Sequence, residues 1–504
     1  MILQNLVFPK ENICNEPELY FHGTTDGKIP AGNEADLFTY FNSFSAYKWK
    51  MYTTVEQVCF RLRCHGNCEI TLWDTKVEDG ADPAAHSFAS TKHEEGGADE
   101  VVLRFSLHDV KGIVYAVIKA ESDTVIFGGS FETVHEPVLP VKIAVGICTF
   151  RREEFVKKTL ETLKRETMEN PDSPLYQNVY VYVSDNGQTL PCEELSNDRI
   201  FVMPNRNTGG SGGFGRCMKE AYEDREKYGL THILLMDDDI VLEPESLFRT
   251  YTLLNFLKEE RKGAMLGGGL LRLDIPYIQH ANGELWQGGR IGFTKRGYDL
   301  RKASYVLRNE ENLPMEYNGW WYCCVPLAAQ FRGFPLPIFI HGDDIEYGLR
   351  FDGNIMTLNG IGVWHDAFDN RKASSMEYYD MRNTLIACAI HHPGYSRLHM
   401  IKRVARHLIG QMLHLRVKDQ ELTMKGVEDF CKGTEFLREL DPTKLHPEIM
   451  KMGYAMQDVS DDLYKFGVDV EKTKPQPSHL YEDGGFANKH LLLSLIHISE
   501  PTRH

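Results

Sequence analysis

The sequence lacks the apolar segments that secretion or membrane insertion requires. No run approaches the ~18 consecutive apolar residues of a membrane-spanning helix. The start, MILQNLVFPKEN, has no basic region followed by an apolar stretch, so it does not resemble a signal peptide. We therefore expect a protein that is neither secreted nor integral to a membrane.

Cysteine is also used in a way that argues against a disulfide framework. The eleven cysteines are odd in number and scattered. Cys148, Cys217 and Cys388 lie within apolar or helical patterns, where free thiols behave as small hydrophobic groups. A cytoplasmic location follows.

Positive charge is in deficit. The 56 basic side chains against 72 acidic ones give a net charge of −16. This balance opposes non-specific attraction to nucleic acid and to anionic lipid, so we expect no nucleic-acid partner. An anionic ligand would need either a bound metal ion or a local basic pocket.

What the chain does have is enough length for about three domains of ~100–200 residues, and the proportions of a soluble globular protein. Residues 1–138 read as a β-sandwich, because short runs rich in Val, Ile, Phe and Tyr are separated by turn residues. The expected strands are 57–63, 68–73, 100–107 and 112–119, with a loop over 74–99. Pro137 and Pro140 mark the boundary to the next unit.

Residues 139–372 alternate between strand and helix. The expected strands are 142–150, 178–184, 200–203 and 232–236, and the expected helices are one carrying Phe155, Val156, Leu160 and Leu163 and one over 216–228. Such alternation predicts an α/β fold with a mainly parallel sheet between two layers of helices. Ligands of such folds gather at the carboxyl ends of the strands.

Residues 373–490 turn helical, most clearly over 378–391 and 401–418. The second of these helices mixes basic and apolar side chains, which favours a domain-packing helix with a solvated basic face; peripheral contact with the inner face of the cell membrane is the alternative. Residues 493–503, LSLIHISEPTR, resemble the translation of a sequencing adapter. We expect 491–504 to be an artefact and exclude it from fold reasoning.

Three adjacent aspartates, Asp237, Asp238 and Asp239, follow an apolar strand. Adjacent carboxylates repel one another and call for a cation or for hydrogen bonds. Because alternate residues of an extended segment share a face, Asp237 and Asp239 can hold Mg²⁺ or Mn²⁺ together while Asp238 points elsewhere. A loop of helix-capping acids before Pro244 is the alternative.

A second acidic pair, Asp343 and Asp344, emerges from an apolar run at the start of a predicted helix. A carboxylate here suits a general base, whereas helix capping explains Asp343 better than Asp344. His365 could complete a cation site of mixed nitrogen and oxygen ligands, although a lone histidine is more often structural. Trp320 and Trp321 could form a platform for a sugar ring or could pack in the core.

Two further patterns are weaker. The run at 205–215, NRNTGGSGGFG, precedes the 216–228 helix and could bring backbone N–H groups close to an anion, or could be a flexible turn. Cys59, Cys64, His65 and Cys68 could suggest zinc, but they lack a second ligand pair and lie in a strand-rich stretch, so we do not expect zinc there.

Taken together, these motifs resemble the bacterial galactofuranosyltransferases of inverting glycosyltransferase family 2, which include mycobacterial galactan polymerases. The resemblance covers about residues 1–420. It rests on the order and spacing of CTFRR (148–152), SDNG (184–187), NRNTGGSGGFGR (205–216), MDDDI (236–240), NGWWYCC (318–324), HGDDIEYGLR (341–350) and WHDAF (364–368).

The resemblance implies a GT-A catalytic domain, a Rossmann-like nucleotide-sugar transferase fold, between an N-terminal β-sandwich and a helical C-terminal region. It also implies roles for individual residues: Asp237, Asp239 and His365 as ligands of Mn²⁺ or Mg²⁺, Asp344 as the catalytic base, Arg152, Asp185, Asn205 and Asp238 at the UDP-sugar donor, and Trp320, Trp321 and Asp343 at the acceptor. His341 and Gly342 replace a bulkier, aromatic-containing stretch of the mycobacterial pattern, so acceptor and linkage do not carry over.

The expected function is metal-dependent, inverting transfer of galactofuranose from UDP-galactofuranose to a glycan or lipid-linked glycan in cell-envelope or capsular polysaccharide synthesis. Two alternatives stay open at this point. One is a family 2 transferase that uses another nucleotide sugar, such as a rhamnosyl donor, and the other is a non-catalytic glycan-binding protein. A homo-oligomer is compatible with either.

Overall fold

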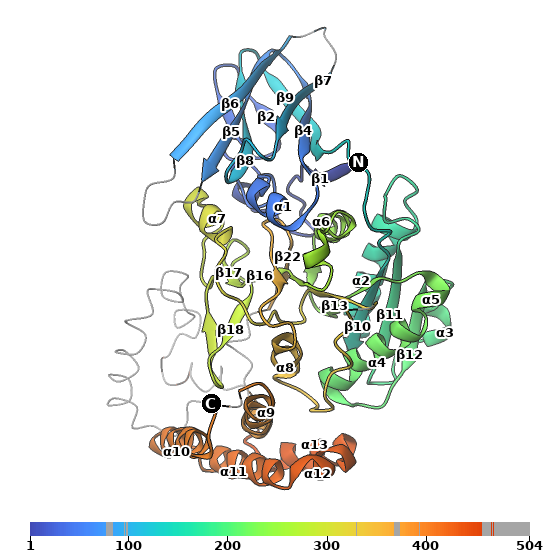
Figure 1. The fold of residues 1–504 in the computed structure, drawn as a ribbon, viewed down its shortest axis with the longest axis vertical. Helices are drawn as coiled ribbons and strands as arrows, with labels where there is room; N and C mark the ends of the chain where they lie inside the picture. Colours follow the sequence, from blue (N-terminus) through green and yellow to red (C-terminus); the bar gives the residue numbers. More distant parts are fainter. Residues whose placement is uncertain are drawn as a thin grey trace.

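The structure is a computed structural model that describes residues 1–76, 84–94, 96, 99–328, 330–366, 373–392, 394–455, 465 and 467. The expected artefact at 491–504 and part of the WHDAF motif lie outside the described residues. Figure 1 shows a β-rich N-terminal unit, a central α/β unit and a row of C-terminal helices. This is the predicted architecture.

The N-terminal unit is a sandwich of two antiparallel sheets, ordered β1-β9-β4-β7, with β2 beside β9, and β3-β8-β5-β6. Its elements are β1 (Ile2–Asn5), β2 (Lys28–Ile29), β3 (Glu34–Asp36), α1 (Ala46–Tyr52), β4 (Gln57–His65), β5 (Cys68–Lys76), β6 (Ala84–His93), β7 (Glu100–Ser106), β8 (Ile113–Ala120) and β9 (Thr124–Glu132).

The loop expected over 74–99 is wrong for part of its length, because β6 runs within it and pairs with β5 from Cys68↔His93 to Lys76↔Ala84. The physical reason is that β6 is an edge strand whose side chains are mostly exposed on both faces. Such a strand lacks the apolar alternation that identifies a half-buried strand in a sequence.

The central sheet has seven strands in the order β12-β11-β10-β13-β20-β15-β21. They are β10 (Ile143–Thr149), β11 (Val179–Asp185), β12 (Ile200–Pro204), β13 (His232–Asp237), β15 (Met265–Gly267), β20 (Cys323–Pro326) and β21 (Ile355–Met356). The first four are parallel, and β20 pairs antiparallel with both β13 and β15. The prediction of a mainly parallel sheet is confirmed, with β20 as the reversed strand.

Helices cover both faces of this sheet. The helices of the central unit are α2 (Glu153–Leu163), α3 (Cys192–Leu195), α4 (Gly209–Glu223), α5 (Arg225–Tyr228), α6 (Pro244–Asn255), α7 (Ala303–Asn309) and α8 (Asp343–Leu349). Successive residues of β10 divide between two core clusters: Val145 belongs to the cluster that includes Leu160 of α2, whereas Ala144 belongs to the cluster that includes Cys217 of α4. Phe155, expected on the buried face of α2, is 52% exposed.

The glycine run is part of a helix rather than a loop before it, since α4 begins at Gly209, seven residues before the predicted start. Close packing explains the glycines. A Cβ on Gly213 would lie 2.1 Å from the Cys148 sulfur, and a Cβ on Gly209, whose φ is +71°, would lie 2.0 Å from the Phe339 carbonyl oxygen.

Two alanine substitutions on α4 are therefore expected to have opposite effects. Gly213→Ala should lower the free energy of unfolding by about 1–3 kcal/mol, because it overpacks the contact with Cys148. Gly215→Ala, whose added Cβ meets only Pro335 at 3.8 Å, should raise it by about 0.5–1 kcal/mol through helix propensity. Urea unfolding of both variants measures the difference, and equal effects would contradict the packing argument.

A small sheet, ordered β14-β22-β16-β17, lies next to the central one. Its strands are β14 (Val241–Leu242), β16 (Gly269–Arg272), β17 (Gln279–Ala281) and β22 (Gly362–His365), and a separate hairpin is formed by β18 (Glu284–Trp286) and β19 (Ile291–Phe293). Val241 of β14 pairs with Trp364 of β22. This antiparallel pairing brings His365 back to the segment that directly follows Asp239.

The N-terminal sandwich and the central unit share one hydrophobic core. Phe41 contacts Trp364 with ring centroids 5.7 Å apart. The buried Glu245 carboxylate of α6 accepts hydrogen bonds from the Asn5 backbone N–H at 2.7 Å and from Arg249 at 3.1 Å. The sandwich is thus packed directly against the sheet that carries the acidic residues.

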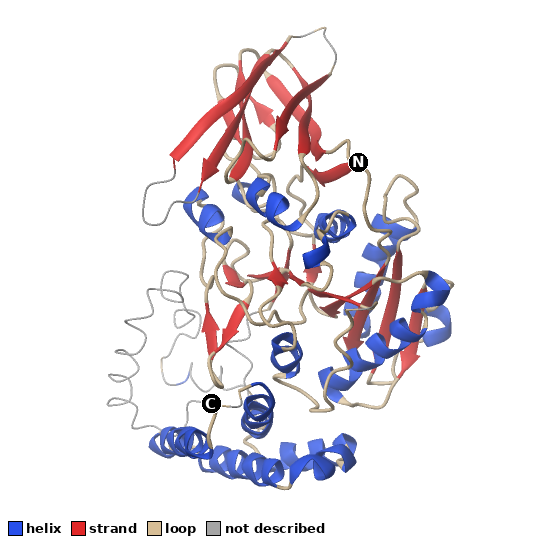
Figure 2. Ribbon diagram, viewed as in Figure 1, coloured by secondary structure: helices blue, strands red, loops and turns tan. Residues whose placement is uncertain are grey.

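The C-terminal region is helical, as predicted (Figure 2), with α9 (Met376–His391), α10 (Arg397–Leu413), α11 (Val417–Cys431), α12 (Gly433–Glu439) and α13 (Pro442–Met452). The helix expected over 401–418 is interrupted after α10, where Leu415 has a φ of 55°. On α10 only Gln411 is buried, and Leu398, Ile401 and Leu413 are each more than half exposed. No helix in the described ranges is long and apolar enough to cross a membrane.

Candidate active site

The predicted site residues of the central sheet meet at the carboxyl ends of its parallel strands. Thr149 of β10 pairs with Asp185 of β11, and Cys148 pairs with Asp237 of β13. The register therefore places Asp185, Thr149 and Asp237 in a row across one edge. This is the edge at which open α/β sheets bind their ligands.

The three aspartates after β13 have distinct surroundings. Asp238 is 4% exposed and accepts hydrogen bonds from the Thr149 hydroxyl at 2.7 Å and from the Arg152 guanidinium at 3.0 Å. Asp239 lies 2.6 Å from the same guanidinium and 3.0 Å from the His365 Nε2. Asp238 thus differs in its contacts from Asp239, and none of the three caps α6, whose N-cap is Glu243.

Burial and charge act on these carboxyls in opposite directions. Burial raises the pKa of Asp237 to about 7, aided by the charges of Asp239 and Asp238. Burial also acts to raise the pKa of Asp239, but the hydrogen bond and charge of His365 outweigh it and hold that pKa below its usual value. An added cation would relieve the repulsion that raises the pKa of Asp237.

His365, at the end of β22, has the orientation of a metal ligand. Its Nδ1 lies 2.6 Å from the Asp366 carbonyl oxygen, which can only accept, so this nitrogen carries the proton. Its Nε2 lies 3.0 Å from the Asp239 carboxylate, to which it donates when the ring is protonated; when that proton is lost, the same nitrogen can offer its lone pair to a cation. A ring nitrogen fixed by a backbone carbonyl is the usual support of a histidine ligand, and carboxylate and imidazole are ligand types that Mn²⁺ accepts. A metal-binding role for Asp237, Asp239 and His365 stays a prediction.

Asp185 and Asn205, predicted at the donor, organise the loops beside this edge. The Asp185 carboxylate is fully buried and accepts from the backbone N–H groups of Gly187 at 3.0 Å and of Thr189 and Leu190 at 2.8 Å. The Asn205 side chain donates to the Asn186 side-chain oxygen at 2.8 Å. Both residues therefore fix the backbone around the sheet edge, and their contact with a nucleotide stays a prediction.

Asp343 and Asp344 open α8, but neither is its N-cap. Gly342 takes that position, so the capping interpretation of Asp343 is wrong. Burial raises the pKa of Asp344 to about 6, and burial together with the Asp344 charge raises the pKa of Asp343 to about 7. The Asp344 carboxylate accepts a hydrogen bond from the Ile345 backbone N–H at 2.8 Å.

Charges from both acidic clusters, the one after β13 and the one at the start of α8, affect the same side chain, Cys148. Cys148, one residue before the end of β10, is a half-buried thiol whose pKa is raised by desolvation and further by the charges of Asp238, Asp237 and Asp343. Asp343 also lies against α4, because a Cβ on Gly210 would be 3.5 Å from its carboxylate oxygen. The carboxyl ends of β10 and β13 and the start of α8 therefore face the same region of the molecule.

Sequence reasoning missed a carboxyl beside Asp344. Glu284, at the start of β18, is buried and accepts from the Tyr317 hydroxyl at 2.6 Å. Burial raises its pKa to about 7, and the Asp344 charge adds to the effect. His341, with a φ of 65°, pairs with Asp380 at 2.7 Å on the other side. Glu284 lies in β18, a strand of three residues, which is too short to give a sequence pattern from which its proximity to Asp344 could be predicted.

The two tryptophans predicted at the acceptor are both buried, Trp320 at 5% and Trp321 at 8% exposed. The Trp320 ring packs edge-on against Phe214 and Tyr347, and its N–H has no acceptor in the part of the chain that the structure describes. The Trp321 N–H donates to the Gly268 carbonyl at 2.9 Å. An acceptor role for either stays a prediction.

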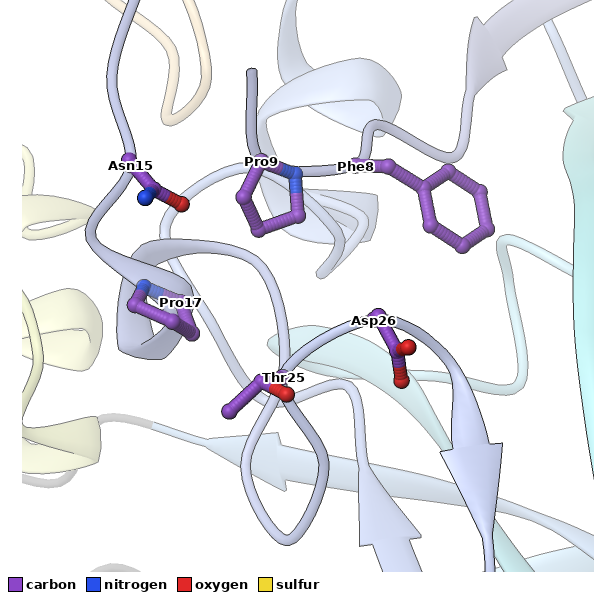
Figure 3. Close-up of a pocket in the computed structure, with 6 residues that line it drawn as sticks. All are labelled: Phe8, Pro9, Asn15, Pro17, Thr25 and Asp26. Carbon is purple, nitrogen blue, oxygen red and sulfur yellow. The ribbon is translucent and has the colours of Figure 1, made fainter. Parts of the chain in front are cut away.

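One surface pocket lies away from all these residues, in the N-terminal unit. Figure 3 shows its lining by Phe8, Pro9, Asn15, Pro17, Thr25 and Asp26. It contains none of the predicted site residues. We therefore do not connect it with the edge of the central sheet that carries Asp237, Asp238 and Asp239, which we call the acidic edge.

Comparison with known proteins gives matches to two family models and to two galactofuranosyltransferases. Residues 6–133 match the family model described as galactofuranosyltransferase 2 N-terminal, and residues 144–302 match glycosyl transferase family 2. Galactofuranosyltransferase GlfT2 of Mycobacterium tuberculosis is 28% identical over 462 residues, which are 86% of this chain and 70% of that protein. GlfT2 of Mycolicibacterium smegmatis is 27% identical over 478 residues, 88% of this chain and 71% of that protein.

Similarity to solved structures adds nothing to this. A Clostridium thermocellum xylanase with CBM22-1 and GH10 modules covers 45% of this chain and 56% of that chain at 8% identity, with a TM-score of 0.18. The sequence matches and the fold carry the assignment. The chain is a glycosyltransferase similar to galactofuranosyltransferase GlfT2, and the match of residues 144–302 to glycosyl transferase family 2 implies a nucleotide-sugar donor and a glycan acceptor.

Proposed function

We propose that the protein transfers galactofuranose from UDP-galactofuranose to a glycan or lipid-linked glycan acceptor, with inversion at the anomeric carbon, in cell-envelope or capsular polysaccharide synthesis. The observation that carries the proposal is the strand register that places Asp185 and Asp237 at one sheet edge, together with the position of Asp343 against α4. The similarity to two GlfT2 proteins supports the choice of donor.

Asp237, Asp239 and His365 would hold Mn²⁺ or Mg²⁺, as family 2 transferases typically depend on a divalent metal. When bound, the ion supplies charge neutralisation of the diphosphate leaving group. Arg152 binds Asp238 and Asp239 and lies at the N-cap of α2, where its guanidinium can also reach a donor diphosphate. Asp238, held by Thr149, orients Arg152 for that contact.

Asp344 would remove the proton from the attacking acceptor hydroxyl. A base works best with a pKa near the pH at which it acts, and burial raises the pKa of Asp344 to about 6. Once deprotonated, the hydroxyl oxygen displaces the nucleotide diphosphate in a single step. One displacement inverts the configuration of the sugar carbon.

The state of Asp344 predicts an acid limit to activity. Only the carboxylate form accepts a proton, and its pKa of about 6 means that kcat/KM should fall about tenfold per unit below pH 6. The side chains that face Asp344 are also titratable, so the acid side of the pH–rate profile reports the coupled titration of all of them. They are His341, Asp343, Glu284 and Tyr317. Initial rates from pH 4.5 to 8 test this, and a rate unchanged down to pH 4.5 would contradict the role.

The donor is tested by nucleotide release. We expect that the protein with Mn²⁺ and an acceptor glycan releases UDP from UDP-galactofuranose faster than nucleotide from UDP-galactopyranose, other UDP-sugars or dTDP-rhamnose. Faster release from dTDP-rhamnose would favour the rhamnosyl alternative. The match to glycosyl transferase family 2 disfavours the non-catalytic glycan-binding alternative.

The remaining proposals concern acceptor and location. Asp343, Trp320 and Trp321 would contribute to the acceptor side, with Asp343 as the residue that faces α4. The exposed apolar side chains of α10, interspersed with Lys402, Arg403 and Arg406, suit peripheral association with the inner face of the membrane or contact with another subunit. A cytoplasmic enzyme at the membrane would meet a lipid-linked acceptor there.

A further inference from the structure

The N-terminal sandwich contains a second cluster of metal-binding side chains, far along the chain from the acidic edge. Cys64, Cys68 and His93 are all buried, and one ligand atom from each lies within 4.8 Å of the other two. From the sequence, Cys64 and Cys68 lacked further zinc ligands. In the structure a third side chain of a ligand type, His93, lies beside them, on the strand β6 that was not predicted.

The fold of the sandwich creates the cluster. Cys64 is near the end of β4 in one sheet, Cys68 begins β5 in the other, and two residues separate the strands after His65. His93, the last residue of β6, pairs directly with Cys68. The three side chains therefore join both sheets at the point where the chain crosses between them.

The backbone at this crossing is built for a tight approach. Gly66 has a φ of +94°, and a Cβ there would lie 2.3 Å from the Asp123 carbonyl oxygen. The register of β4 shifts between Arg63 and Cys64, and such irregularities re-aim a side chain. Cys64 is 0% and Cys68 1% exposed, so both thiols lie between the sheets.

The distances suit a tetrahedral cation. The two sulfurs are 3.9 Å apart. Two thiolates bound to one zinc ion at ~2.3 Å each are about 3.8 Å apart at the tetrahedral angle, whereas a disulfide requires ~2.05 Å.

The histidine has the support that ligands of this kind have. His93 Nδ1 lies 2.6 Å from the Gly66 carbonyl oxygen, so Nδ1 carries the proton and Nε2 carries the lone pair. A backbone carbonyl that fixes the tautomer in this way is the usual outer partner of a histidine bound to zinc. His65, by contrast, is 62% exposed at its side chain and pairs with Asp99, so it takes no part.

We propose that Cys64, Cys68 and His93 bind one Zn²⁺ that clips the two sheets of the N-terminal sandwich together, with a water molecule as the fourth ligand. Soft thiolate ligands select zinc over the Mn²⁺ or Mg²⁺ of the acidic edge. The site is structural, and it is independent of the transfer reaction.

Metal content and cobalt spectroscopy of the full chain test this proposal. We expect about one zinc per chain after incubation with Zn²⁺ and desalting, and cobalt in its place should give thiolate-to-metal charge-transfer absorption. Zinc should remain in a D237A/D239A variant and be lost in Cys64→Ser and His93→Ala. Cys59→Ser and His65→Ala, on the same strand but outside the cluster, are matched controls that should keep it.

Removal of zinc by a chelator should also lower the midpoint of thermal unfolding by several degrees, with recovery on adding Zn²⁺ back. Three results would overturn the proposal. They are a cobalt spectrum without thiolate absorption, zinc that is lost with Asp237 and Asp239 but kept in Cys64→Ser, and an intact mass lower by two thiol hydrogens, which would show a disulfide. The cobalt spectrum is read on the unmodified protein, so it decides even if a variant fails to fold.

Discussion

Asp344→Asn is expected to abolish sugar transfer while leaving UDP binding intact. The change keeps the size of the side chain and its place at the start of α8, but it removes the carboxylate that accepts the proton. Loss of a general base typically costs about 10²–10⁴-fold in rate, so kcat should fall at least about a hundredfold. UDP affinity, measured by calorimetry with Mn²⁺, should change less than about twofold because the base does not hold the donor.

The matched control is Asp352→Asn. It makes the same chemical change at an exposed position just after the same helix, where φ is 51° and asparagine is well tolerated. Its activity should equal that of the unmodified protein. Full activity in Asp344→Asn would remove the assigned base, and joint loss of activity and UDP binding would assign the residue to donor binding instead.

Replacing a ligand of the acidic edge is expected to remove Mn²⁺ binding and transfer together. His365→Ala and Asp239→Asn each take away one side of the 3.0 Å contact between the imidazole and the carboxylate. We expect activity at least about a hundredfold lower at saturating Mn²⁺, because charge on the leaving group is no longer compensated. EDTA should stop the unmodified enzyme, and Mn²⁺ should restore it.

Electron paramagnetic resonance of Mn²⁺ gives a readout other than activity. The unmodified protein should bind the ion, and both variants should bind it far more weakly. Asp198→Asn, at an exposed position away from the site, is the matched control and should behave as the unmodified protein does. Activity without any divalent metal would contradict the roles of Asp237, Asp239 and His365.

Much of the acidic edge could be predicted because its residues end strongly apolar strands. Asp185 and Asp237 end strands β11 and β13, and the parallel pairing of those strands with β10 brings their ends together. His365 needed more than periodicity, since its approach to Asp239 depends on the two-residue strand β14. The family resemblance supplied that link, and the structure agrees with it.

The predictions that were wrong or missing share a physical cause. A local sequence pattern carries no information about packing against residues that are distant in the chain. β6 lies at a sheet edge with polar side chains on both faces, so its sequence resembles a loop. The glycines of α4 oppose helix formation by propensity, yet contacts with Cys148 and Phe339 require them within the helix. Glu284 and His93 become neighbours of their clusters only through tertiary contacts.

The most direct test of the central claim is the structure of the product. The protein, Mn²⁺, UDP-galactofuranose and a short galactofuranosyl acceptor should yield an acceptor heavier by one hexose, with the new linkage opposite in anomeric configuration to the donor by NMR. A product that retains the donor configuration would contradict the single displacement by Asp344. The absence of any sugar transfer under these conditions, with transfer from another nucleotide sugar, would contradict the proposed donor.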